Sequence, residues 1–164
     1  MKAPRIETLQ PKTMVGLAAE MSVTQNSTAA LWRSFMEQRH NIQNVIGKDV
    51  YSLQEYPSAD YFSNFNPNTI FTKWALAEVN NTQHIPKGFQ PYTLQGGTYA
   101  VFHHKGNNGQ DFTSLLMFIF NTWLPSSDYV LDHRPHFEVL GAKYKNNDPN
   151  SEEEVWIPIT KKES

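Results

Sequence analysis

Apolar positions at helical spacing occur in two segments of the chain. The first segment follows the polar stretch 22–28, which offers several N-cap residues, and is expected to end at Gly47. The second follows the loop 106–111 and is expected to end at Pro125, since proline cannot continue a helix. Their apolar stripes consist of Leu31, Trp32, Phe35, Met36, Arg39 and Ile42 in the first helix, and Phe112, Leu115, Leu116, Ile119, Phe120, Trp123 and Leu124 in the second.

Strand-like segments flank both predicted helices. The segment 89–104 is broken by the pair Gly96-Gly97, and the turn-rich stretches 57–68 and 146–150 separate neighbouring strands. The expected strands are 5–21, 50–56 and 70–79 around the first helix, and 89–104, 135–142 and 154–159 around the second.

The two halves therefore read alike: strand, helix, strand, strand. Matching apolar positions lie 84 residues apart, as 137 is from 53; the pairs are Gly16 and Ala100, Leu31 and Leu115, Phe35 and Ile119, and Leu53 and Phe137. We interpret the chain as one domain, residues 1–164, with pseudo-repeats at about 5–80 and 89–160. The predicted fold class is α+β, in which duplicated βαββ modules form an antiparallel sheet with both helices on one side. A central ligand cleft is expected where the modules meet.

Composition narrows the class of protein. The chain has 164 residues, of which 39% are hydrophobic and 18% charged, as in an ordinary globular domain. Its 14 basic residues are scattered along the chain, and together with 16 acidic residues they give a net charge of −2. Direct nucleic-acid binding is therefore not expected. The absence of cysteine excludes disulfides and thiolate chemistry and favours the cytoplasm. No stretch approaches the roughly 20 apolar residues of a membrane helix, and no apolar leader follows Met1.

Glu138 is the most informative position, because it is a lone acid in the apolar run 137–140. A carboxylate in an apolar strand is costly unless it meets a cation, a hydrogen-bond donor or a reaction. An outward position on a half-solvated strand is the alternative, and the pattern alone leaves both open.

The histidines do not predict a metal site. His103 and His104 are adjacent, so on a strand they point to opposite faces, and no helix carries histidines four residues apart. We therefore predict neither a metal nor a cofactor.

Four runs carry a family resemblance: 99–106 (YAVFHHKG), 121–125 (NTWLP), 136–140 (HFEVL) and 154–159 (EVWIPI). Together they resemble the GyrI-like family, which includes the effector-binding domains of AraC-type and MerR-type bacterial transcription regulators that respond to drugs. The resemblance implies tandem SHS2-like modules around an aromatic-walled cleft with a central glutamate.

By position, Glu138 matches the family's central acid, which attracts lipophilic cations, and Trp123 and Trp156 match segments that border its pocket. Tyr99 and Phe102 are expected on the strand opposite. Strand alternation leaves open which face Trp156 occupies. The family often has tyrosine two residues after the glutamate, and Leu140 here puts a second polar contact in doubt. No helix-turn-helix fits before Arg5, so the chain reads as a stand-alone effector-type domain.

These observations lead to three functional hypotheses. The first is non-catalytic binding of small amphipathic or cationic compounds, as in multidrug sensing, with the ligand alone or a separate transcription regulator as partner. The second is a hydrolase that opens strained, electrophilic natural products with Glu138 as the base. The third is a gyrase-inhibitor-like interaction protein with a topoisomerase as partner, which would show an exposed apolar patch.

Overall fold

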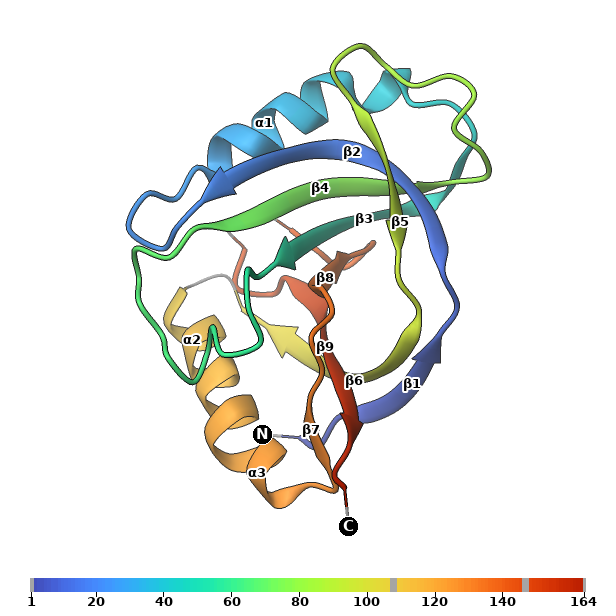
Figure 1. The fold of residues 1–164 in the computed structure, drawn as a ribbon. Helices are drawn as coiled ribbons and strands as arrows, with labels where there is room; N and C mark the ends of the chain where they lie inside the picture. The colour runs from blue at the N-terminus through green and yellow to red at the C-terminus, as the bar shows by residue number, and fades with distance from the viewer. Residues whose placement is uncertain (1, 107–108, 146–147, 164) are drawn as a thin grey trace.

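The elements follow the same order in each half of the chain (Figure 1). The computed structural model describes residues 2–106, 109–145 and 148–163. The first half contains β1 (Arg5–Leu9), β2 (Lys12–Met21), α1 (Thr28–Gln38), a 3-10 turn (Arg39–Asn41), β3 (Val45–Glu55) and β4 (Phe71–Val79). The second contains β5 (Gln90–Leu94), β6 (Gly97–Lys105), α2 (Gly109–Phe118), a π-helical turn (Ile119–Trp123), α3 (Leu124–Ser126), β7 (Tyr129–Leu131), β8 (His136–Leu140) and β9 (Glu152–Lys161).

All the strands pair antiparallel in one nine-stranded sheet, which confirms the predicted α+β class. The strand order is β1-β6-β9-β8-β3-β4-β2-β5, and β7 pairs with β9. The halves meet at the centre, where β3 lies beside β8, and again at both ends of the sheet, where β1 pairs with β6 and β5 pairs with β2. At the central seam Leu53 is directly opposite Phe137, and these are the two positions that the sequence repeat related to each other.

The sheet is strongly curved, and its two faces are packed differently (Figure 1). Its concave face holds one apolar cluster, the concave-face core, to which both halves contribute. The members are Met14, Tyr51, Leu53, Trp74, Leu76, Leu94, Tyr99 and Phe137. The opposite face carries both helices over two separate clusters: α1 covers one with Leu31 and Phe35, and the α2 segment covers the other with Leu115 and Ile119.

Gly16 allows the close pairing of β2 with β4. A Cβ atom at this position would lie 1.8 Å from the backbone oxygen of Ala75, so no other residue fits without separating the strands. The α1-side half of the sheet therefore depends on this glycine.

The helix ends differ from the sequence predictions. The first helix ends at Gln38 and not at Gly47, which instead lies in β3 with a φ of 70°, at an irregular register between Val45 and Val50. The second continues past Pro125 to Ser126. The π-helical turn places Pro125 in the first turn of α3, where the missing backbone N–H of proline costs no helical hydrogen bond.

Other differences are smaller. The strand β7 was not predicted, since three residues are too few for a recognisable alternation. Residues 107–108 and 146–147 of two predicted loops lie outside the described residues. Within the described ranges, no helix is both long enough and apolar enough to cross a bilayer.

Candidate ligand-binding site

Glu138 lies on the helix-bearing face of the sheet, at the seam between the halves. On β8 it is directly opposite Ser52 of β3 and Val155 of β9. Val155 belongs to the cluster under α2, whereas Leu140, on the same face of β8, packs against the cluster under α1. The carboxylate is therefore held between the areas that the two helices cover.

Burial is the largest influence on the Glu138 carboxyl and raises its pKa to about 7. The side chain keeps some exposed surface, but the surrounding protein replaces most of the water that would solvate a charge. Lys73 and a hydrogen bond from Gln54 lower the pKa, and the negative charge of Glu153 raises it. Because the resulting pKa is near neutrality, modest changes in the site switch the charge of Glu138.

Gln54 is the counterpart of Glu138 in the first half, 84 positions earlier. Its Nε2 donates to Glu138 Oε1 at 3.4 Å. A neutral amide at the pseudo-equivalent position supports the carboxylate, whereas a second acid there would repel it. The first half therefore contributes no second carboxylate at the equivalent position.

An aromatic cluster of four rings includes His136, two residues before Glu138 on β8, and connects three parts of the fold. Phe62, from the segment between β3 and β4, stacks on Phe120 at 4.6 Å and on His136 at 5.2 Å between ring centroids. Tyr56 contacts Phe62 edge-on at 4.8 Å and His136 at 5.0 Å. Phe120 lies in the π-helical turn, so the cluster joins the helix, the sheet and the 57–70 segment.

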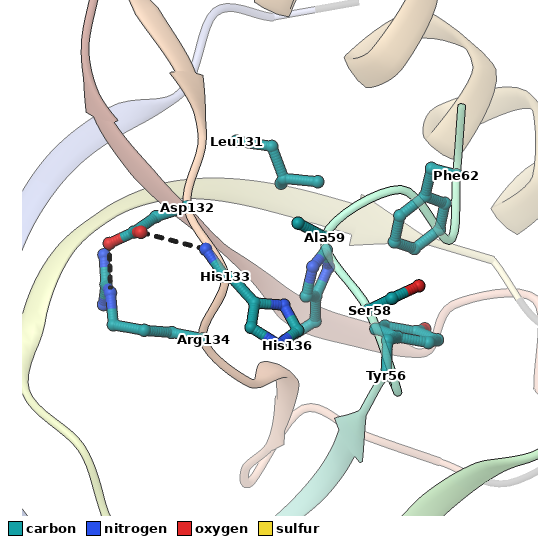
Figure 2. Close-up of a pocket in the computed structure, with 9 residues that line it drawn as sticks. All are labelled: Tyr56, Ser58, Ala59, Phe62, Leu131, Asp132, His133, Arg134 and His136. Carbon is teal, nitrogen blue, oxygen red and sulfur yellow. Dashed lines mark hydrogen bonds and ion pairs between the residues drawn. The ribbon is translucent and has the colours of Figure 1, made fainter. Parts of the chain in front are cut away.

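Figure 2 shows the cavity at one side of this cluster. It has a volume of about 20 Å³ and is lined by Tyr56, Phe62, Leu131, Arg134 and His136, among others. That volume is enough for about one water molecule, so the rings are closely packed in this state. Burial lowers the pKa of His136 to about 3, so its ring is neutral at physiological pH.

Tyr56 also senses the charge of Glu138. Burial is the main reason that the pKa of Tyr56 is raised, and the second is the negative charge of Glu138. A tyrosine hydroxyl and a titratable carboxyl therefore lie within electrostatic reach of each other on this face.

A buried pair lies further along the same face. His104 Nδ1 lies 3.1 Å from Glu153 Oε1, and burial raises the pKa of Glu153 while His104 lowers it. Among the described residues, no group of three or more His, Asp or Glu side chains could hold a metal ion.

Two of the predicted site residues share the face of Glu138. Phe102 lies opposite Val155, so Glu138, Val155 and Phe102 form one row across β8, β9 and β6. Trp123 contacts the Phe102 ring edge-on at 5.3 Å. Both belong with the cluster under α2, and Phe102 is two strands away from Glu138.

Tyr99 and Trp156, which were predicted to line a pocket with Glu138, lie on the other, concave face of the sheet; the sequence had left the face of Trp156 open. Trp156 is directly opposite Phe137, the neighbour of Glu138, and the two rings stack at 5.2 Å. Tyr99 contacts both rings and is fully buried. The period-two alternation of strands separates these side chains from the carboxylate.

The sequence reasoning did not identify Gln54, Tyr56, Phe62, Lys73 or Phe120 as neighbours of Glu138. The 84-residue repeat contained a signal for Gln54, because it relates that position to Glu138. The aromatic residues Tyr61, Phe62 and Phe65 in a turn-rich stretch were a second signal, since rings in a loop need a surface to pack against.

Comparison with solved structures shows the same fold in several proteins. SAV2435 bound to tetraphenylphosphonium has a TM-score of 0.72 and 17% identity, over 98% of this chain and 94% of that one. An integron cassette protein from the mobile metagenome of Vibrio cholerae has a TM-score of 0.61 and 16% identity, over 97% of each chain. A hydrolase from Listeria innocua has a TM-score of 0.61 and 8% identity, over 96% of this chain and 92% of that one.

No curated protein sequence is significantly similar to the chain. A family model, however, matches residues 5–159, which is nearly the whole sequence, and confirms the GyrI-like resemblance. The chain belongs to the Cass2 family of integron-associated effector binding proteins.

Proposed function

We propose that the protein binds small lipophilic cations on the helix-bearing face of its sheet, with Glu138 as the counter-ion. The observation that carries this proposal is the position of the carboxylate, partly buried between the two helices. Besides burial, its influences are a hydrogen bond from Gln54, the positive charge of Lys73 and the negative charge of Glu153, and no described side chain forms a salt bridge with it. A bound cation would supply the missing partner and favour the charged form.

The aromatic cluster supplies surfaces suited to such a ligand. Ring faces attract cations by roughly 0.5–2 kcal/mol per contact. Tyr56 lies within electrostatic reach of the carboxylate, and Phe62 and Phe120 continue the same aromatic cluster. His136 adds no opposing charge, because burial keeps its pKa at about 3. Aromatic walls with a single acid select for charge sign and apolar bulk more than for detailed shape.

The similar structure of SAV2435 was solved with tetraphenylphosphonium, a lipophilic cation of this class. That supports the choice of probe, although 17% identity shows the fold alone. Leu140 keeps the wall beside Glu138 apolar on the α1 side, which fits a ligand held by charge and packing.

Titration with tetraphenylphosphonium, followed by calorimetry at pH 8, tests the proposal. Glu138→Gln should weaken binding by about 2 kcal/mol or more, as expected when one partner of a buried charge pair is removed. The control variant is Glu20→Gln, an exposed acid on β2, which should bind like the wild type. The neutral triphenylphosphine oxide should bind weakly to all three proteins. Equal affinity of wild type and Glu138→Gln would refute the role of Glu138.

The pH dependence provides an independent test of the same site. With a Glu138 pKa of about 7, only a few per cent of the protein carries the charge at pH 5.5. A ligand that needs the charged form should therefore bind roughly 30-fold more weakly at pH 5.5 than at pH 8. Glu138→Gln should remove this dependence.

A second function is supported by a separate observation: Glu138 has a pKa suited to a general base, and Tyr56 lies within its electrostatic reach. We infer that hydrolysis of strained electrophiles is the alternative, and a solved structure of this fold is described as a hydrolase. Turnover of epoxide or cyclopropane compounds that rises with pH through about 7 and is lost in both Glu138→Gln and Tyr56→Phe would favour it. Absence of turnover with intact cation binding would leave the binding function alone.

A further inference from the structure

The concave face opens into a second cavity, which is separate from Glu138. It has a volume of about 330 Å³, within the range of small-ligand pockets. Its lining includes Glu55, Tyr56, Tyr92, Gln95, His133 and Arg134. Glu55 is two residues from Leu53 on β3, so it points to the concave face, whereas Gln54 and Glu138 point to the other.

Glu55 is positioned by the edge of the concave-face core. Its Oε1 accepts a hydrogen bond of 2.7 Å from the indole Nε1 of Trp74. The ring of Tyr92 lies 4.8 Å from that of Trp74, and the Tyr92 hydroxyl also interacts with Glu55. Burial is the main reason that the pKa of Tyr92 is raised, and the charge of Glu55 adds to it. A carboxylate has about four acceptor positions, so two such donors leave acceptor capacity for a ligand.

The cationic side chain in this cavity wall is already engaged. Arg134 Nε donates to a carboxylate oxygen of Asp132 at 2.7 Å, and Arg134 Nη2 donates to the carbonyl oxygen of Thr98 at 2.7 Å. Figure 2 shows the guanidinium turned toward Asp132. Among the described residues, none forms a salt bridge with Glu55.

The molecule contains a counterpart of this arrangement in its other half. Trp74 is paired with Leu53, and Trp156 is paired with Phe137, so the two tryptophans are equivalent about the seam. Trp156 Nε1 also donates to a carboxylate, Glu154 Oε1, at 3.1 Å. Each half therefore has an indole that holds a glutamate at the margin of the concave face.

In the second half this indole and glutamate are occupied by a cation of the chain itself. Arg5 NH2 lies 2.7 Å from Glu154 Oε2, and its guanidinium carbon lies 5.9 Å from the centre of the Trp156 ring. The two glutamates are not equivalent positions: Glu154 lies two residues before Trp156 on β9, whereas Glu55 reaches Trp74 from the neighbouring strand β3. The first half still combines a glutamate, an indole and a neighbouring tyrosine, and the open cavity lies beside them. The Arg5 contact shows the kind of group that an indole-bonded glutamate accepts in this protein.

We propose that the Glu55 cavity is a second binding site, which takes a small organic cation with an ammonium or guanidinium head. The head would pair with Glu55, as Arg5 pairs with Glu154, and an apolar substituent would lie against the rings of Tyr92 and Tyr56. The proposed site is distinct from the Glu138 site, since the two acids lie on opposite faces of the sheet, although Tyr56, the residue after β3, borders both.

The Trp74 indole resonance in a ¹H–¹⁵N spectrum reports on the Glu55 cavity, because Trp74 is the one of the four tryptophans that donates to Glu55. Benzylguanidinium at pH 7.5 is the probe, and benzyl alcohol is the neutral control. We expect a saturable shift of the Trp74 resonance with benzylguanidinium only. Glu55→Gln should weaken that response at least about tenfold, whereas Glu138→Gln and Glu20→Gln should leave it unchanged.

Tyr92→Phe provides a second variant, which keeps the ring and removes only the hydroxyl. It should retain binding within about threefold, since the ring face and Glu55 remain. No saturable shift in the wild type, a shift that persists unchanged in Glu55→Gln, or a shift abolished by Glu138→Gln would each overturn the second site. Failure of tetraphenylphosphonium to bind, with the Trp74 response intact, would instead refute only the Glu138 site.

Discussion

Replacement of Glu138 by glutamine should change how the stability of the protein depends on pH. The pKa of this carboxyl is 4.5 in its ordinary state and about 7 in the folded protein, where burial disfavours the charge. Between these values the folded state holds a proton that the unfolded state has released. The free energy of unfolding therefore falls as pH rises through this window, and the contribution is fully present below pH 4.5.

The expected size follows from about 1.4 kcal/mol per pKa unit, which gives about 3 kcal/mol between pH 4.5 and 7. Glu138→Gln has no carboxyl to titrate and loses this term. The variant should therefore gain about 3 kcal/mol on the wild type as pH rises from 4.5 to 8. His136 opposes the trend in both proteins, because its lowered pKa of about 3 makes stability fall as pH falls below 6.5. The difference between the two proteins removes that contribution.

Urea denaturation at pH 4.5, 6, 7 and 8, followed by tryptophan fluorescence, measures this difference. The slope with denaturant should be the same for both proteins, so that midpoints convert to free energies. Parallel curves of stability against pH would refute the reasoning, because they would mean that Glu138 has the same pKa in the folded and unfolded states.

Two further predictions concern packing. Gly16→Ala should destabilise the protein by about 2–4 kcal/mol, since its Cβ would lie 1.8 Å from the Ala75 oxygen. Gly47→Ala should cost only about 1 kcal/mol, because Gly47 has a φ of 70° but nothing within 4 Å of the added Cβ. Thermal melts compare the two variants. Phe62→Ala should lower stability by about 2 kcal/mol through loss of its stacking on Phe120 and His136. Phe65 is 54% exposed, so Phe65→Ala should lower stability by less than about 0.5 kcal/mol. Equal urea midpoints for these two variants would contradict the packing described for the aromatic cluster.

The architecture was largely predictable because local patterns and the global fold agree. The centres of both apolar stripes face the sheet as expected, with Leu31, Phe35, Leu115 and Ile119 buried, whereas Met36 of the first predicted stripe is 50% exposed. The relation of Leu53 to Phe137, read as a repeat in the sequence, reappears as direct pairing of β3 with β8. A repeat constrains topology because two copies of one module can share a sheet only in a few ways.

The site was less predictable because face assignment on strands depends on register. Tyr99 and Trp156 were grouped with Glu138 by the family resemblance, yet alternation places them on the concave face. Phe62 and Phe120 come from a loop and a π-helical turn, and neither has a period that reveals its direction. Residues that meet only in three dimensions are not identified by any local pattern.

The seam between β3 and β8 also has a consequence for assembly. Neither half completes a sheet alone, because β3 and β8 would become uncovered edges with unpaired backbone groups. The strands β1 and β5 would also lose their partners β6 and β2, which belong to the other half. The concave-face core draws on both halves, so each would also expose the apolar surface that the other covers. The duplicated modules are thus not two small domains joined by a linker; each one is the folding partner of the other.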